Sequence, residues 1–337
     1  MARRLMAPLS AIFTLAGLLL FAYYLWRTGV GNVAQAVAQL GVGFLLVLLI
    51  SGVRPAVRSL AWTRCVEGDE RLGFGEALQA YLIGDSLGNL IPFGIVVSEP
   101  TKVVLVRQSL PFVHGLAAIT VENLFYSLSV MLFLFAGSLA LLFSFALPKF
   151  LRLSAIITPI AILALAIAGF YFSRHDAPLS ALFGRFLHER GRERVRDFER
   201  RVFDFYRKHG SRAWAILLLE AIYHLSSVLE AYVTLIFVSD AMPTPLKAFA
   251  FEAVNRITTV VFKFIPFRIG IDETSTGLLA SVLGLGAASG VALAITRKGR
   301  ILCWTAVGAL LLAWRGLSLR ELIAETQRAT ANEAESN

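Results

Sequence analysis

Long runs of apolar residues with few charges between them dominate the chain. Residues 11–26, 127–147 and 156–172 are three such runs. An α-helix rises about 1.5 Å per residue, so about 20 apolar residues are needed to cross a hydrocarbon core about 30 Å thick. No segment alternates apolar and polar residues with a period of two, as the strands of a membrane barrel do. The pattern therefore predicts an all-α polytopic membrane protein.

Six helices are expected to cross the membrane. Their approximate bounds are 11–26, 40–62, 113–147, 151–172, 214–238 and 290–314. Two more segments, 76–109 and 247–289, are long enough to enter the membrane but are interrupted by proline, glycine and charged residues. Each must enter and leave by the same face, either as a re-entrant hairpin or as a pair of full spans, and the interruptions favour the hairpin. The expected domain, residues 1–316, therefore has about six transmembrane helices plus two re-entrant hairpins, or about eight nominal spans.

Lysine and arginine residues set the expected orientation. Residues 174–212 contain eleven of them, so this loop is expected on the cytoplasmic side. Basic residues at the N-terminus and at the inner end of the second span indicate the same side: Arg3, Arg4, Arg54, Arg58 and Arg64. The polar tail, 317–337, is then cytoplasmic as well, and the expected location is the inner cell membrane.

The basic loop has an amphipathic pattern of its own. Val195, Phe198, Val202 and Phe205 recur at three- and four-residue spacing, with arginines between them. Such a helix lies on a membrane surface, with its apolar face in lipid and its arginines at anionic headgroups. Nucleic acid is the competing partner for a basic segment, but an apolar face tethered to the membrane argues against it.

Composition agrees with a membrane protein. Of 337 residues, 57% are hydrophobic and 16% are charged, against roughly 25% charged in an average soluble domain. The two cysteines, Cys65 and Cys303, are too few and too far apart for a disulfide framework or a metal site. The N-terminal apolar run resembles a signal peptide, but it is long for one and is expected to remain as the first span.

The two interrupted segments contain an internal repeat. Residues 91–99, IPFGIVVSE, align without a gap with residues 265–273, IPFRIGIDE, and five of the nine positions are identical. Further on, residues 118–120 match residues 294–296 as Ala-Ile-Thr. In the expected topology the repeat halves, about 40–147 and 214–316, are inverted. Inverted repeats with interrupted helices are typical of transporters, with the site between the halves near the middle of the membrane.

The interruptions have a chemistry that suits an anion. Pro92 and Pro266 each break the preceding helix. A helix is then expected to start at Glu99, with Pro100 at its first position, and another near Asp272 and Glu273. A helix N-terminus at membrane depth attracts phosphate. The alternative is that Glu99 and Glu273 only cap their helices.

Other ionisable residues are expected at the same depth. The candidate substrate-binding set is Asp85, Asn89, Pro92, Glu99, Lys102, Glu122, Arg256, Pro266, Arg268, Asp272, Glu273 and Arg297. Ionisable groups inside a membrane are costly and usually functional. The alternative for Glu122 and Arg256 is a structural ion pair across helices. Glu220 and His224, four residues apart, could share a metal or a proton, although a structural role is favoured for such a pair, and no metal or cofactor is expected.

These motifs together resemble a known family. The residues that carry the resemblance are 88–94, Glu99, Glu122 and 265–273, and they resemble the lysylphosphatidylglycerol synthase transmembrane, or flippase-like, family. The resemblance extends over about 5–313 and implies a stand-alone membrane domain without the family's soluble synthase domain. Family members often have a glycine directly before the helix-starting glutamate, where this chain has Ser98 or Asp272, which leaves the ligand open.

The expected function is movement of an amphipathic lipid between membrane leaflets. The lipid is a phospholipid or a polyprenyl- or hopanoid-type lipid, with an anionic headgroup at the hairpin tips. One alternative is a membrane enzyme that modifies lipid headgroups, but the chain has no His-x4-Asp, Asp-x-Asp or metal-ligand spacing, so an enzyme is not expected. Another is a non-transporting membrane scaffold. The sequence leaves the oligomeric state open, a homo-oligomer included.

Overall fold

The computed structural model describes residue 26 and residues 30–68, 70–90, 95–173, 210–262 and 268–315. The regular elements in these ranges are all helices, as predicted. They are α2 (Val30–Leu40), α3 (Gly43–Arg64), α4 (Phe74–Leu90), α5 (Ile95–Leu105), α6 (Phe112–Ser144), α7 (Lys149–Ser173), α10 (Gly210–Val238), α11 (Pro245–Val261), α12 (Ile271–Val282) and α13 (Ala287–Trp314). The first predicted span, most of the basic loop and the polar tail lie outside the described residues.

Four of the described helices are long and apolar enough to cross a membrane: α3, α6, α7 and α10. They agree with the spans predicted at 40–62, 113–147, 151–172 and 214–238. The segment predicted to cross at 290–314 lies in α13, a helix of 28 residues. Arg297, Lys298 and Arg300 interrupt the apolar character of α13.

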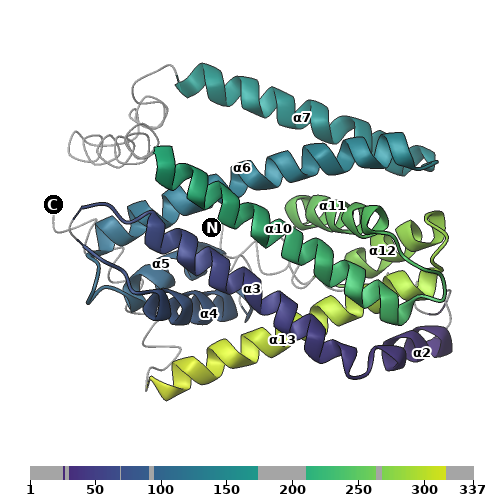
Figure 1. Cartoon of the computed structure of the whole chain (residues 1–337), viewed down its shortest axis with the longest axis horizontal. Helices are drawn as coiled ribbons and strands as arrows, with labels where there is room; N and C mark the ends of the chain where they lie inside the picture. The colour runs from purple at the N-terminus through teal and green to yellow at the C-terminus, as the bar shows by residue number, and fades with distance from the viewer. Residues whose placement is uncertain are drawn as a thin grey trace, which may run out of the picture.

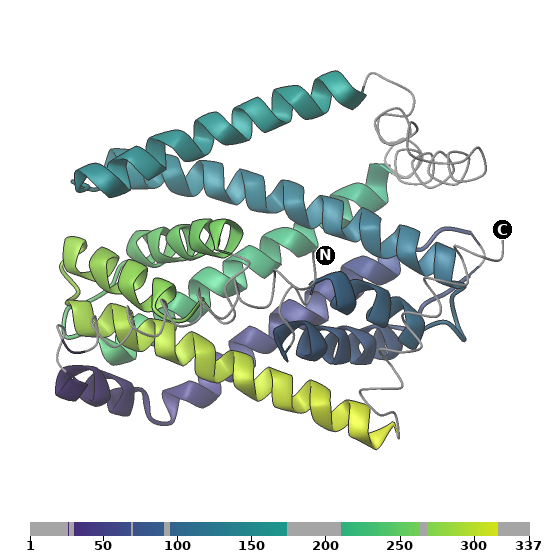
Figure 2. The ribbon, with the colours of Figure 1, turned by 180° about the vertical axis from the view of Figure 1, so that it is seen from behind.

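The long helices form a bundle around one central pair (Figures 1 and 2). Helices α3 and α10 pack against each other over much of their length. Helix α4 packs on α3 and α13, and α11 packs on α10 and α6. Helix α7 lies outside α6 and turns most of its surface away from the bundle.

Each interrupted segment folds as a pair of short helices. The pairs are α4 with α5, of 17 and 11 residues, and α11 with α12, of 17 and 12 residues. At about 1.5 Å per residue, even the longer helix of each pair reaches only about 25 Å. The two pairs lie toward opposite ends of the bundle (Figures 1 and 2). The turns between the helices, with Pro92 and Pro266, lie outside the described residues.

One predicted helix start is wrong. Helix α5 begins at Ile95, so Pro100 is its sixth residue and Glu99 lies in its second turn. A proline at that position removes one helical hydrogen bond, to the Val96 carbonyl, without preventing the turn before it. The start predicted near Asp272 is correct, because α12 begins at Ile271.

Close helix contacts fix the hairpins to the long helices. A side-chain carbon added to Gly308 of α13 would overlap the Leu82 carbonyl of α4, and one added to Gly137 of α6 would overlap Ala253 of α11. Small residues let helix backbones approach closely where no hydrophobic force drives association in lipid. Glycine at these two positions therefore determines how near α4 lies to α13 and α11 lies to α6.

Candidate functional site

Charged side chains form a layer near the middle of the central helix pair. Along α3, Arg54 and Arg58 lie between Val47, in one apolar cluster, and Ala61, in another. Along α10, the polar residues from Glu220 to Glu230 lie between members of the same two clusters. We call this region, with Arg54 and Arg58 of α3 and Glu220 to Glu230 of α10 at its centre, the polar layer. Further members, described below, come from α4, α5, α6, α11 and α13, so the layer joins both predicted repeat halves.

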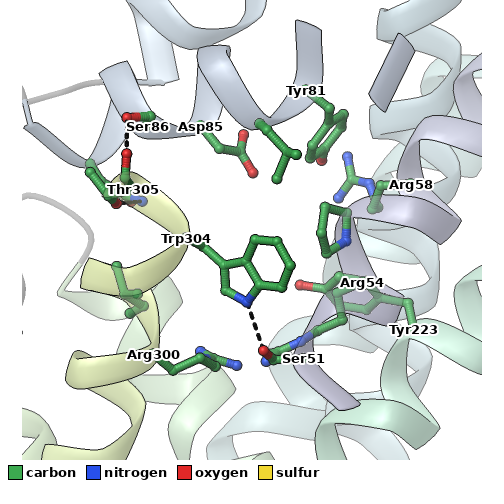
Figure 3. A pocket seen from close by; sticks show the side chains of 14 residues that line it. Ser51, Arg54, Arg58, Tyr81, Asp85, Ser86, Tyr223, Arg300, Trp304 and Thr305 are labelled. Carbon is green, nitrogen blue, oxygen red and sulfur yellow. Dashed lines mark hydrogen bonds between the residues drawn. The ribbon is translucent and has the colours of Figure 1, made fainter. Parts of the chain in front are cut away.

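A cavity of about 230 Å³ opens within the polar layer. Helices α3, α4 and α13 supply most of its wall, and α10 adds Tyr223 (Figure 3). Its polar lining residues are Ser51, Arg54, Arg58, Tyr81, Asp85, Ser86, Asn89, Tyr223, Arg300, Trp304 and Thr305.

One side of the cavity carries more positive charge than its carboxylate partner neutralises. Arg54 of α3 and Arg300 of α13 both contact Oε2 of Glu230, with Arg300 Nη1 at 2.6 Å. Two arginines thus share one buried carboxylate. Each guanidinium has five N–H donors in a fork that matches carboxylate and phosphate oxygens. Donors therefore remain for an anion that enters the cavity.

Arg58 is held more deeply in the wall. Its Nη2 donates to Glu122 Oε2 at 2.7 Å and to Asn123 Oδ1 at 3.0 Å, and its Nε also contacts Glu122. The guanidinium carbon lies 3.9 Å from the ring centre of Tyr126. Glu122 is fully buried. Its predicted alternative, a structural ion pair across helices, is therefore what the structure shows.

The opposite side of the cavity is acidic. Lys102 Nζ lies 2.8 Å from Asp85 Oδ1 and 3.0 Å from Glu99 Oε1. Lys102 is buried, whereas the Asp85 side chain is 49% exposed, so the carboxylate and not the ammonium faces the cavity (Figure 3). Asn123 Nδ2 donates to Glu99 at 3.2 Å and so connects this side to the Arg58 pair.

Polar contacts between helices close the cavity at its edge. The Trp304 indole N–H donates to Ser51 Oγ at 2.7 Å and connects α13 to α3 (Figure 3). Ser86 Oγ donates to the Thr305 carbonyl at 2.8 Å, and Asn89 Nδ2 donates to Thr305 Oγ1 at 3.1 Å. These contacts would have to break if α13 moved away from α3 and α4.

Arg256 forms a separate network behind the cavity. It donates to the Tyr126 hydroxyl at 2.9 Å and to the Tyr223 hydroxyl at 3.3 Å, and its Nε lies 3.1 Å from Glu252. Arg297 donates to the same Glu252 at 2.8 Å. Tyr223 therefore touches both the cavity and this network.

The second predicted helix start lies away from the cavity. Glu273 accepts the Gly270 N–H at 2.8 Å, which caps α12, and it also pairs with Lys298. Arg268 Nε lies 3.0 Å from Asp272. Of the described residues that line the cavity, none comes from α12 or its cap.

The sequence-based set is thus distributed over several places. Asp85 and Asn89 line the cavity. Glu99, Lys102 and Glu122 lie directly behind the lining, while Arg256 and Arg297 belong to the neighbouring network. In the described part of the chain, no three histidine, cysteine or acidic residues are grouped as a metal site would require, so Glu220 and His224 have no further ligand there.

Sequence reasoning missed the arginines that define the cavity. Arg54 and Arg58, which the sequence assigned to the inner end of a span, lie within α3 and pair with carboxylates inside the bundle. A charge inside an apolar helix can be paired by another helix rather than by a membrane surface. The sequence feature that could have indicated the cavity is the pair of arginines four residues apart within an otherwise apolar span, together with Arg300 inside α13.

Among known proteins, the chain matches one family model. A family model described as the lysylphosphatidylglycerol synthase TM region matches residues 9–308, a range that contains every residue of the cavity lining. No match was found among curated proteins or solved structures.

Proposed function

The chain belongs to the lysylphosphatidylglycerol synthase transmembrane family, a membrane protein family related to lipid handling, and from that premise we propose that it moves a lipid between leaflets. The lipid's anionic headgroup would bind in the cavity, while its chains stay in the bilayer. The observation that carries the proposal is the placement of Arg54 and Arg58, inside the apolar helix α3, and Arg300 of α13 around one cavity. Ionisable groups at such depth are costly and usually serve transport.

The size and charge of the cavity suit a headgroup. A volume of about 230 Å³ is below the roughly 300–1,000 Å³ of sites that enclose a whole drug-sized ligand. Arg54 and Arg300, which share Glu230, can each offer further donors to phosphate oxygens. Charge-assisted contacts of this kind are stronger than neutral hydrogen bonds. The cavity therefore favours a phosphate-containing headgroup over an uncharged one.

The arrangement of helices supports an inverted repeat. The order from α3 to α6, a long helix, two short ones and a long one, recurs from α10 to α13. The first short helix of each half packs on the last long helix of the other half: α4 packs on α13, and α11 packs on α6. The hairpins lie toward opposite ends of the bundle (Figure 1). In an inverted repeat the counterpart of the cavity would lie among α10, α11 and α6, where Arg256 is instead enclosed by hydrogen bonds.

This pairing suggests how access could alternate. The cavity between α3, α4 and α13 would be the open site in this state, and the Arg256 network the closed one. Both hairpins would be re-entrant, the termini and the basic loop cytoplasmic, and the loop helix bound to anionic lipid of the inner cell membrane. In this proposal the polar layer binds and carries a headgroup and does not perform catalysis.

The test is transport of phosphatidylglycerol with a fluorescent chain in proteoliposomes. Arg300→Gln removes a cavity cation, and charged hydrogen bonds are worth about 1.5–3 kcal/mol, so we expect transport to slow by about 10- to 100-fold. Arg315→Gln is the matched control at the C-terminal cap of the same helix, because Arg315 lies outside the cavity and bonds to Gln79 at 2.7 Å. Wild-type rates in both Arg300→Gln and Arg54→Gln would refute the proposed role of the cavity.

A further inference from the structure

Glu220 of α10 is a buried carboxyl group without a close hydrogen-bond partner among the described residues. Its side chain has no exposed surface, and within the described part of the structure neither of its oxygens has a hydrogen-bond partner. Burial of an ionised carboxylate without hydrogen bonds is costly, so such groups are usually paired or neutral. The proposed headgroup site makes no use of this residue.

Charged and polar groups surround Glu220 on several helices. From α3, Arg58 Nε lies 4.0 Å from Glu220 Oε1, and Cys65 lies within electrostatic range. From α6 and α11 come Glu122 and Arg256, respectively. Helix α2 carries no charged residue, while Arg297 and Arg300 of α13 are paired with Glu252 and Glu230. Arg58 is therefore the cation placed to compensate Glu220.

Neighbouring hydroxyl and imidazole groups are already engaged. Ser129 Oγ donates to the Tyr126 carbonyl at 2.7 Å and lies 3.0 Å from His224 Nε2. The Ser129 hydroxyl therefore already has two neighbours, and it also lies beside Glu220. Arg256 in turn donates to two tyrosine hydroxyls. In the described part of the structure, none of these groups makes a close hydrogen bond to the Glu220 carboxyl.

One arginine therefore serves two carboxyl groups. Arg58 gives its close contacts to Glu122, at 2.7 Å for Nη2, and only the 4.0 Å approach to Glu220. Two carboxylates near one cation, away from water, do not both ionise readily. We propose that Glu220 is a proton-binding site, neutral while Arg58 pairs with Glu122, and that the number of protons held by Glu220 and Glu122 together changes with the partners of Arg58.

The second half of this inference rests on the proposed function. Arg58 also lines the cavity, so a phosphate that draws its guanidinium forward would weaken the contact to Glu122. Glu122 would then take a proton from a hydronium ion of the bulk water, so that one O–H bond forms on the carboxyl group while one O–H bond of the hydronium breaks and leaves water; the reverse step would occur when the headgroup leaves. Because linkage is reciprocal, higher proton concentration would strengthen phosphate binding by the same factor.

Infrared spectroscopy of the full chain in lipid nanodiscs tests the proton site without any substrate. At neutral pH, the wild-type minus Glu220→Gln difference spectrum should contain the C=O band of a protonated carboxylic acid. Glu230→Gln is the matched control on α10, and its difference spectrum should contain carboxylate bands, because Glu230 carries two arginines. Carboxylate bands in the Glu220→Gln difference would overturn the proposal.

A second variant keeps the proposal testable if Glu220→Gln does not fold. Glu220→Asp keeps a carboxyl group, so it should shift the protonated band without removing it, whereas an unmoved band would assign it to another residue and refute the site. Coupling is tested by mixing the protein with phosphatidylglycerol vesicles and a pH indicator. Proton uptake should occur in wild type and be lost in Arg58→Gln. If the infrared band is present but no proton uptake occurs, only the coupling is refuted. Normal lipid transport in the same preparation would then leave the proposed function standing.

Discussion

The sharing of Arg58 makes an unusual prediction about stability. Glu122→Gln removes the carboxylate that Arg58 contacts most closely, and breaking a buried ion pair on one side costs about 3–5 kcal/mol. Here a second carboxyl group lies 4.0 Å away. Glu220 can ionise and take over the arginine, which recovers part of that cost. We therefore expect Glu122→Gln alone to lose about 2–3 kcal/mol of unfolding free energy.

Removing both carboxyl groups should show the full penalty. Glu122→Gln with Glu220→Gln leaves Arg58 buried without a carboxylate, so the loss should reach about 3–5 kcal/mol. Glu220→Gln alone should cost less than about 1 kcal/mol, because a neutral carboxyl is replaced by a neutral amide of similar size. The double variant is then less stable than the sum of the singles, by about 1–2 kcal/mol, which is a coupling energy typical of groups in one network.

The assay is reversible unfolding in mixed detergent micelles, with all variants measured at the same pH. Leu302→Ala is a control, because this apolar side chain of α13 is 55% exposed and lies outside the polar layer; it reports the cost of an unrelated change in the bundle. Additive losses in the double variant would refute the sharing of Arg58, and so would a loss of several kcal/mol in Glu220→Gln alone.

Three further predictions test the packing, the edge of the cavity and the orientation. Gly308→Ala should lower the unfolding free energy by about 1–3 kcal/mol in the same assay, because the added carbon overlaps a carbonyl of α4, whereas Gly75→Ala meets no atom within 4 Å and should cost little. Trp304→Phe removes the indole N–H that connects α13 to α3; faster thiol labelling of a cysteine placed at Ile301, which lines the cavity, should follow, and an unchanged rate would contradict this closing role. A cysteine at Met242 should react with an impermeant reagent in intact cells and one at Gly191 should not, so labelling at Gly191 would reverse the orientation.

Much of the fold follows from the apolar pattern alone. The spans predicted at 40–62, 113–147, 151–172 and 214–238 correspond to α3, α6, α7 and α10. Membrane helices are this predictable because every backbone polar group in lipid must be satisfied within its own segment. The same pattern located the two interrupted segments, which fold as the helix pairs α4 with α5 and α11 with α12.

The site was predictable only in part. Asp85 and Asn89 of the expected set line the cavity, and Lys102 and Glu99 support it from behind. Glu273 was singled out through the repeat and caps α12 as the alternative interpretation required. Helix-start chemistry is local, because it connects residues three or four positions apart, so the sequence could indicate a cap without indicating which cavity it serves.

The sequence by itself determined the membrane class, the positions of the long helices and the presence of ionisable groups within or beside apolar segments. The tertiary structure alone decided which of those groups face one another. Arg58 and Glu122 are 64 positions apart, and Arg54 and Glu230 are 176 positions apart. Whether an arginine inside an apolar helix meets lipid, water or a carboxylate depends on which helix packs beside it. That packing is set by close contacts such as the one between Gly308 and α4. The residue pattern within a single helix does not show which helix will pack beside it.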